Sequence, residues 1–166
     1  MKRKLLAFAA IGILAALSVG SPLGATPAAK KTIKIDSRTR GVDSGSGKFV
    51  LQLGKTGGDL GTMTFTRSFR PGGDKTFIAP DGQHYSIATE TDTLKGRNGT
   101  LLIRAVGPSY LVGGSFGNYE VWNGTWSIVS GTGDYSGLRG GGRYFGMAIQ
   151  TSAPPVIKTS TGFVQP

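Results

Sequence analysis

The segment Gly124–Gly146, GTWSIVSGTGDYSGLRGGGRYFG, is the most informative part of the sequence for the fold of this chain. Its first part alternates Trp126 and Ile128 with Ser127, which is the two-residue period of a β-strand. The glycine-threonine-glycine sequence at 131–133 then permits a tight turn, because glycine adopts backbone angles that other residues avoid. The segment therefore predicts a strand that ends in a sharp reversal of the chain.

Two apolar side chains follow that reversal, Tyr135 and Leu138. Glycines at 137 and 140–142 let the backbone pass close to neighbouring strands before it re-enters the sheet. We expect Tyr135 and Leu138 to fold back over one end of the sheet and to close that end of a barrel. No helix-forming run follows the glycines, which argues against a phosphate-binding loop.

Glycine also recurs at short intervals in the rest of the chain, and it makes up 28 of the 166 residues. Short runs rich in β-branched and aromatic residues lie between the glycines, and no sustained helical period is present. The chain is therefore predicted to be all-β, a single antiparallel β-barrel of about eight strands, since closure leaves no unpaired strand edge. The expected strands are 32–36, 48–53, 60–70, 76–79, 85–89, 99–106, 118–122, 125–130, 143–149 and 162–165.

Two local features refine this expectation. Phe65, Arg67 and Met63 share one face of the strand at 60–70, so Arg67 is predicted to lie near a barrel mouth or in a polar interior. The dipeptide Asn123-Gly124 predicts a hairpin between the strands on either side of it, because Asn-Gly favours tight hairpin turns.

The segment 124–146, with the upstream strand Gly99-Thr-Leu-Leu-Ile-Arg, resembles small secreted bacterial proteins of the allene oxide cyclase barrel-like group. Plant allene oxide cyclases and dirigent proteins are more distantly similar. The resemblance implies an antiparallel barrel of about eight strands with an apolar interior, and in the plant proteins such a barrel holds a hydrophobic small molecule. It carries no functional residue onto this sequence, so it implies the fold and not the activity.

The N-terminus has the pattern of an export signal. Three basic residues precede the apolar run 5–19, which is short for a membrane span, and small residues follow it. We expect a signal peptide at 1–28, a flexible N-terminal segment at 29–47 that can hold a first strand, and a β-barrel domain at 48–166. The protein is then bacterial and secreted, periplasmic or extracellular, without an integral membrane span after cleavage.

Composition limits the partners. Three of the 19 basic residues lie in the leader, so residues 30–166 carry 16 basic and 9 acidic residues and a formal charge of +7. The basic residues are scattered and form no stripe, so no nucleic-acid partner is predicted. With no cysteine and the single histidine His84, the sequence predicts no metal site, and it indicates no cofactor. A homo-oligomer is compatible with the sequence.

Three carboxylates are candidate site residues: Glu90, Asp92 and Glu120. Glu120 lies within an apolar strand and would be the best candidate for a catalytic or binding carboxylate if it points inward. Glu90 and Asp92 are two residues apart, so a strand places them on one face, where they could bind calcium or act on a sugar. A solvated sheet edge is the simpler interpretation of that pair, and the one we expect.

Aromatic residues supply the other candidates. They could line a ligand cavity or form an ordinary barrel core, and both alternatives stay open. The candidates for a cavity lining are Phe65, Tyr119, Trp122, Trp126, Tyr135 and Tyr144.

Three functions follow from these observations. The first is a secreted, non-catalytic barrel that binds a small apolar or amphipathic ligand or an envelope component. The second is an isomerase or cyclase of the allene oxide cyclase type, which acts by confining its substrate. The third is a surface-interaction protein that uses the positive charge.

Overall fold

The structure, a computed structural model, describes most of the chain from residue 29 onward. The signal peptide expected at 1–28 lies outside the described residues. No helix among the described residues is long and apolar enough to cross a membrane. The described ranges are 29–41, 43–69, 77–78, 84–114, 117–149 and 154–166.

The described part of the chain is built from antiparallel strands and one short 3-10 helix, η1 (Gly133–Tyr135). Within the described residues, each run that was expected to be extended falls on a strand, and most strands are longer than expected. Residues 70, 76 and 79, which belong to two of the expected strands, lie outside the described residues. The strands are β1 (Lys31–Gly41), β2 (Ser44–Leu53), β3 (Gly57–Phe69), β4 (Phe77–Ile78), β5 (His84–Gly96), β6 (Thr100–Gly114), β7 (Gly117–Gly131), β8 (Arg139–Ile149) and β9 (Pro155–Gln165).

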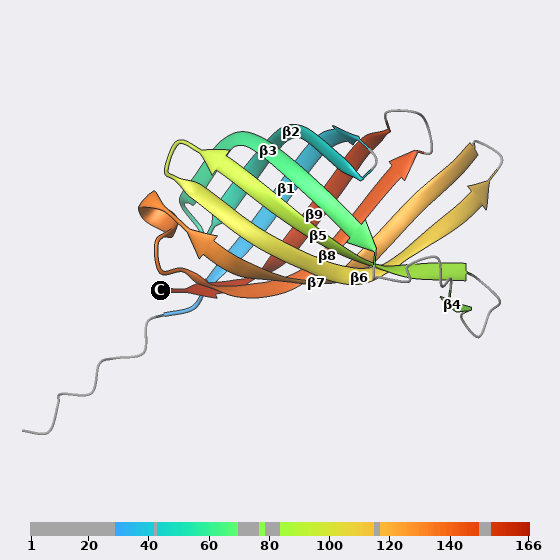
Figure 1. Cartoon of the computed structure of the whole chain (residues 1–166). Helices are drawn as coiled ribbons and strands as arrows, with labels where there is room; N and C mark the ends of the chain where they lie inside the picture. Colours follow the sequence, from blue (N-terminus) through green and yellow to red (C-terminus); the bar gives the residue numbers. More distant parts are fainter. Residues whose placement is uncertain (1–28, 42, 70–76, 79–83, 115–116, 150–153) are drawn as a thin grey trace, which may run out of the picture.

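The strands close into a barrel (Figure 1). Their order is β3-β2-β1-β9-β8-β7-β6-β5, and a further pairing of β3 with β5 joins the two edges of the sheet. The two-residue strand β4 pairs only with β5, so the cylinder itself has eight strands. The expected single antiparallel barrel is therefore confirmed.

The barrel begins earlier in the chain than expected. Strand β1 pairs with β2 on one side over residues 33–41 and with β9 on the other over residues 31–40. The segment 29–47 thus contains one complete barrel strand and the first residues of β2, and the barrel strands start at Lys31 rather than at residue 48.

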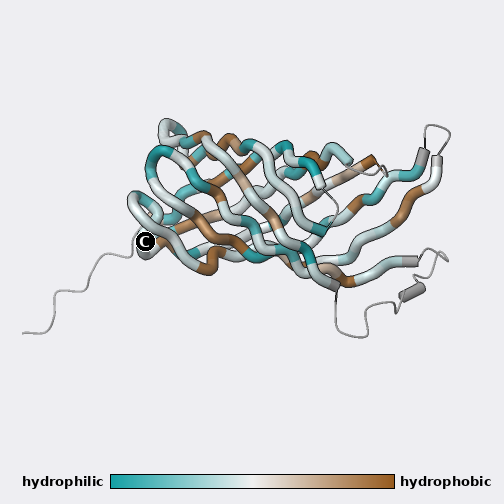
Figure 2. Tube along the Cα trace, turned by 45° about the horizontal axis from the view of Figure 1, so that its top comes forward, coloured by the Kyte–Doolittle hydropathy of each residue, from teal (hydrophilic) through white to brown (hydrophobic). Residues whose placement is uncertain are grey.

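Buried and exposed residues alternate along the strands. Figure 2 shows hydrophobic and hydrophilic residues following one another along the barrel strands. In β1, Ile33 and Ile35 are buried while Thr32 and Lys34 are exposed. Apolar residues from the other strands join Ile33 in one core cluster. Burial of this apolar surface is the main force that holds the cylinder together.

One end of the barrel is closed by the turn after β7, as the glycine pattern predicted. Tyr135 in η1 is 3% exposed and belongs to the core cluster, and Leu138 packs against that cluster. The Tyr135 hydroxyl donates a 2.7 Å hydrogen bond to Oδ2 of Asp59 in β3. Gly133 has a φ of +60°, the left-handed conformation that the turn requires. We call this the plugged end.

The hairpin expected at Asn123-Gly124 is wrong, because both residues lie inside the continuous strand β7. Gly124 pairs with Tyr144 of β8, and a side chain there would collide with the carbonyl oxygen of Val106 in β6. Glycine is therefore needed for the close approach of two strands rather than for a turn. Pairing on both sides of β7 overrides the local turn preference.

Candidate functional site

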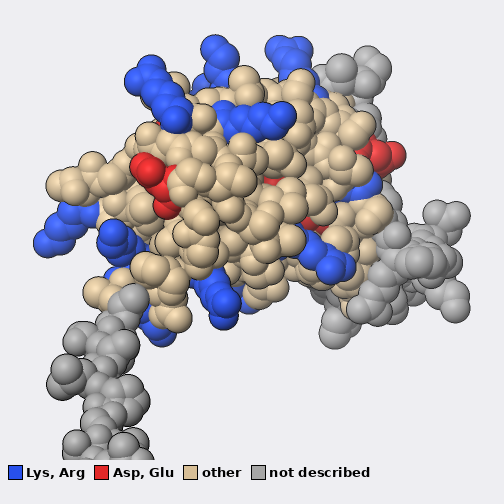
Figure 3. Space-filling view, turned by 60° about the vertical axis from the view of Figure 1, so that its left-hand side comes forward, with Lys and Arg blue, Asp and Glu red and all other residues tan. Residues whose placement is uncertain are grey.

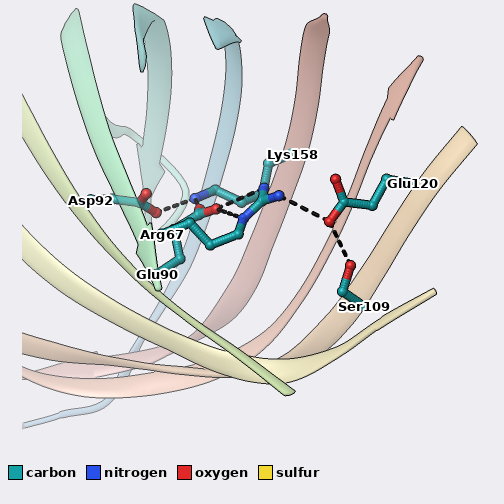
Figure 4. Close-up of polar contacts among 6 residues, drawn as sticks. All are labelled: Arg67, Glu90, Asp92, Ser109, Glu120 and Lys158. Atoms are coloured by element: carbon teal, nitrogen blue, oxygen red, sulfur yellow. Dashed lines mark hydrogen bonds and ion pairs between the residues drawn. The ribbon is translucent and has the colours of Figure 1, made fainter. Parts of the chain in front are cut away.

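Six polar side chains from five strands form a connected cluster inside the barrel (Figure 4). We call this cluster the interior network. It crosses the cylinder from Asp92 at one end to Ser109 at the other. Its members are Arg67 of β3, Glu90 and Asp92 of β5, Ser109 of β6, Glu120 of β7 and Lys158 of β9.

Arg67 is the centre of the interior network. Its Nε and Nη2 donate to Oε2 of Glu90 at 3.2 and 3.1 Å, and its Nη1 donates to Oε1 of Glu120 at 3.0 Å. The guanidinium also lies 4.2 Å from the centre of the Trp122 ring, a cation–π contact. Arg67 is only 6% exposed, so the polar interior that the sequence allowed for this residue is the alternative that the structure confirms.

Lys158 links the two carboxylates of β5. Its ammonium donates to Oε1 of Glu90 and to Oδ2 of Asp92. Lys158 is 4% exposed and Asp92 is fully buried, so these ion pairs are shielded from water. A buried charge is tolerated only when it is paired in this way.

The interior network is close to electrical balance. Burial alone would raise the pKa of Glu90, but the charges of Lys158 and Arg67 bring it below its ordinary value. Burial raises the pKa of Asp92 to about 7, and the Glu90 carboxylate adds to the rise although Lys158 opposes it. With Asp92 protonated, two cations face the two carboxylates of Glu90 and Glu120.

Two buried polar atoms near this network make no hydrogen bond with the described part of the chain. They are Oδ1 of Asp92 and Nε1 of Trp122. Trp122 packs over Gly146 of β8, where an added Cβ would lie 2.5 Å from the indole ring. Gly146 therefore provides the space that the Trp122 ring needs beneath Arg67.

The interior network approaches solvent at the end of the barrel opposite the plug. The Glu120 side chain is 15% exposed, and its Oε1 also accepts a 2.6 Å hydrogen bond from the Ser109 hydroxyl. Leu111 lies directly opposite Glu120 in the β6–β7 pairing and is 59% exposed. We call Ser109, Leu111 and Glu120 the mouth. It combines an apolar side chain with a carboxylate.

The structure places five of the six aromatic candidates in the core. Phe65, Trp122 and Tyr144 lie beside the interior network, and the Arg67 guanidinium is 5.9 Å from the centre of the Phe65 ring. The Nε1 of Trp126 donates to the carbonyl oxygen of Thr161 at 3.1 Å, and Tyr135 closes the plugged end. Tyr119 alternates with Glu120 and is half-buried on the outer face.

The expectation of a solvated edge for Glu90 and Asp92 is wrong. The two carboxylates do share one face of β5, but that face is the interior, where they are 3% and 0% exposed. They are retained there because Arg67 and Lys158 come from other strands to neutralise them. Glu120 points inward, as its candidacy required.

Sequence reasoning missed Lys158 and Ser109. Lys158 alternates with exposed Ile157 and half-buried Thr159, and it shares the inward face of β9 with Val156. The sequence signal that could have identified Lys158 is its position on the apolar face of a strand, where a lysine is expected only with a buried partner. Its partners could not be read from the sequence, because they lie 66 and 68 residues away.

Several hollows lie on the outside of the described part of the molecule. Two of them lie over β1, β2 and β9, and one is lined by Arg38, Lys48 and Ile157 among others. The described residues contain no group of three or more histidine or carboxylate side chains placed to hold a metal ion.

The fold and the site together define the class of protein. It is a closed eight-stranded antiparallel barrel that is plugged at one end and holds a network of paired charges in its interior. No protein-family model, curated protein or solved structure matches the chain. The resemblance to the allene oxide cyclase barrel-like group therefore rests on the sequence segment alone.

Proposed function

We propose that this chain is an exported, non-catalytic β-barrel protein that binds an anionic component of the bacterial cell envelope through its outer surface. The supporting observation is the separation of charge between the interior and the outside. In the described part of the chain, the acidic side chains that reach the surface are Asp36, Asp43, Asp134 and, at the mouth, the partly exposed Glu120, against 12 exposed basic residues. These are Lys30, Lys31, Lys34, Arg38, Arg40, Lys48, Lys55, Lys95, Arg97, Arg104, Arg139 and Arg143.

The fold produces this asymmetry by withdrawing carboxylates from the surface. Glu90, Asp92 and Glu120 belong to the interior network, and Asp59 is held beneath the plug by Tyr135. The outer surface is therefore more positive than the composition of the chain suggests. Such a surface attracts polyanions over a range of about 10 Å at moderate salt.

The experiment measures retention of residues 30–166 on a sulfated polysaccharide matrix and on isolated envelope fractions of the host. Retention should weaken steadily as salt is added, because the attraction is electrostatic. The interior variant Asp92→Asn serves as a matched control, since it changes no surface charge. Absence of binding to both matrices at physiological salt would contradict the proposal.

The mouth supports a second candidate, the binding of a small amphipathic ligand. Leu111 exposes apolar surface directly opposite Glu120, and Ser109 and Arg67 hold the Glu120 carboxylate in place. Native mass spectrometry of the protein purified from its own host tests this candidate. A co-purifying molecule that is lost in Leu111→Ser and retained in the outer variant Val129→Ser would support it, and the absence of any such molecule would count against it.

A cyclase or isomerase that confines its substrate is supported less well. The Arg67 side chain occupies the space beside Phe65 and Trp122, where a confined substrate would have to lie. Asp92 has a pKa suited to proton transfer near neutrality, but it is 0% exposed and out of reach of a substrate.

A further inference from the structure

The outward side chains of β2, β1, β9 and β8 form rows across half of the cylinder. The pairing registers define one row as Gln52, Lys34, Thr161 and Arg143, and the next as Val50, Asp36, Thr159 and Phe145. A third row contains Lys48, Arg38, Ile157 and Met147. We call this half of the outer surface the basic face.

Positive charge predominates on the basic face. It carries Lys34, Arg38, Arg40, Lys48 and Arg143, all exposed. The acidic residue of the three rows is Asp36. Its Oδ1 accepts a 2.7 Å hydrogen bond from the Thr159 hydroxyl, and its Oδ2 lies 2.8 Å from Nζ of Lys34. The remaining basic side chains have no acidic neighbour within these rows. Figure 3 shows lysines and arginines projecting from the molecule with few acidic groups between them.

Large apolar side chains project between these charges. Val50 is 53% exposed, Phe145 50%, Ile157 48% and Phe163 58%. One hollow on the basic face is lined by Lys34, Arg143 and Phe163 among others. A hydrophilic polyanion would satisfy the charges but would leave this apolar surface in water, which costs free energy.

The other half of the cylinder provides an internal comparison. On β3 and β5 its outward residues are mainly threonine, with Thr64 opposite Thr93 and Thr66 opposite Thr91. Exposed charge within the strands of that half comes from Lys95 and Arg104. That half also exposes the aliphatic side chains of Leu60, Leu111, Val112 and Val129. The basic face therefore differs from it by its larger number of exposed cations and by the exposed rings of Phe145 and Phe163.

We infer that the basic face docks on the surface of an anionic phospholipid bilayer. This inference rests on the proposed function and names its partner. Lysine and arginine would contact the anionic headgroups, while Phe145 and Phe163 would enter the interfacial region, where aromatic side chains are favoured. A bilayer is the envelope partner that satisfies both the charges and the exposed apolar groups.

The test is flotation of residues 30–166 with vesicles of phosphatidylcholine alone and with vesicles that also contain phosphatidylglycerol. Binding is expected only to the anionic vesicles. Each basic residue near such a surface contributes roughly a fivefold gain in binding, so Arg38→Gln with Lys48→Gln should lose roughly 20–30-fold. The matched control is Lys95→Gln with Arg104→Gln, which removes the same charges from the other half and should lose much less.

A second pair of variants tests the apolar contribution. Phe145→Gln with Phe163→Gln should weaken vesicle binding and leave retention on sulfated polysaccharide unchanged. The control Leu60→Gln with Val129→Gln removes exposed apolar groups elsewhere and should change neither. Circular dichroism of every variant confirms that the barrel is intact.

The outcomes separate the two proposals. Retention on the polysaccharide without binding to anionic vesicles would overturn the bilayer inference and leave the proposed function standing. Equal losses from the basic-face pair and from its control would also overturn it. Failure to bind the anionic vesicles, the sulfated polysaccharide and the envelope fractions would overturn both proposals.

Discussion

Arg67 and Glu90 lie directly opposite each other across the β3–β5 pairing, and their side chains form a salt bridge of 3.1 Å inside the barrel. This pairing is the one that joins the two edges of the sheet. The ion pair therefore lies at the seam of the cylinder. Because Arg67 also binds Glu120 of β7, it ties the seam to a strand that lies two places beyond β5 in the barrel.

Removing Arg67 should destabilise the barrel strongly. In Arg67→Ala, Glu90 would keep Lys158 but Glu120 would lose its cation, and breaking a buried ion pair on one side costs about 3–5 kcal/mol. Urea unfolding followed by the fluorescence of buried Trp122 and Trp126 measures the loss. The triple variant Arg67→Met, Glu90→Gln, Glu120→Gln should recover part of it. A loss below about 1 kcal/mol in Arg67→Ala would show that the network is not required for stability.

Asp92 should make stability depend on pH between about 4 and 7. Its pKa in the folded chain is raised to about 7, whereas the unfolded chain releases this proton near 3.8. The folded state therefore binds more protons in that range, and the contribution of Asp92 is fully present below pH 4 and lost as pH rises to 7. Glu90 acts in the opposite direction, because its pKa is lowered and its contribution is lost as pH falls below about 4.5.

The variant Asp92→Asn isolates this effect, since asparagine resembles the protonated acid. Its free energy of unfolding relative to the native chain should rise steadily from pH 4 to pH 7 and level off above that. The exposed Asp134→Asn variant is the control and should follow the native chain. Parallel curves for the native chain and Asp92→Asn would contradict the raised pKa.

Tyr135→Phe should loosen the plugged end. The variant keeps the buried ring and removes the 2.7 Å hydrogen bond to Asp59, which would cost about 1–3 kcal/mol because the acceptor is charged. Asp59 would still accept the backbone N–H groups of Leu60, Arg97 and Asn98. Its pKa, which these hydrogen bonds hold below the ordinary value against the effect of burial, should rise. NMR titration measures the rise, and Tyr119→Phe should leave it unchanged.

Gly146→Ala should displace the Trp122 ring. The added methyl would lie 2.5 Å from the indole, and overfilling a packed interior costs about 1–3 kcal/mol. The tryptophan emission should change as the contact with Arg67 is lost. Gly113→Ala is the matched control, since its nearest neighbour would be 3.5 Å away. Unchanged emission together with unchanged stability in Gly146→Ala would contradict this prediction, because it would mean that the surrounding side chains accommodate the methyl group without displacing the Trp122 ring.

Much of the architecture could be predicted from local pattern. The alternation of Met63, Phe65 and Arg67 placed all three on one face of a strand, and that face is the interior. The glycines at 131–133 and the apolar Tyr135 predicted a closed barrel end. These features depend on neighbours within a few residues, which is the range over which sequence periodicity carries information.

The interior network could not be predicted in the same way. Glu90 and Asp92 look like the edge of a solvated strand until Lys158 and Arg67 are placed beside them. These partners are 23 to 68 residues distant, and only the strand order and register bring them together. The Asn123-Gly124 pair misled for the same reason, since β6 and β8 on either side of it set its conformation.

The secondary structure class, the period of each strand and the turn that closes one end follow from the sequence, because backbone preference and side-chain alternation act between near neighbours. Which charges face inward and which face outward depends on the closed barrel. That division arises when the β3–β5 pairing closes the sheet, since closure buries one face of every strand. The carboxylates of β5 on that face are then neutralised by Arg67 from the adjacent strand β3 and by Lys158 from β9.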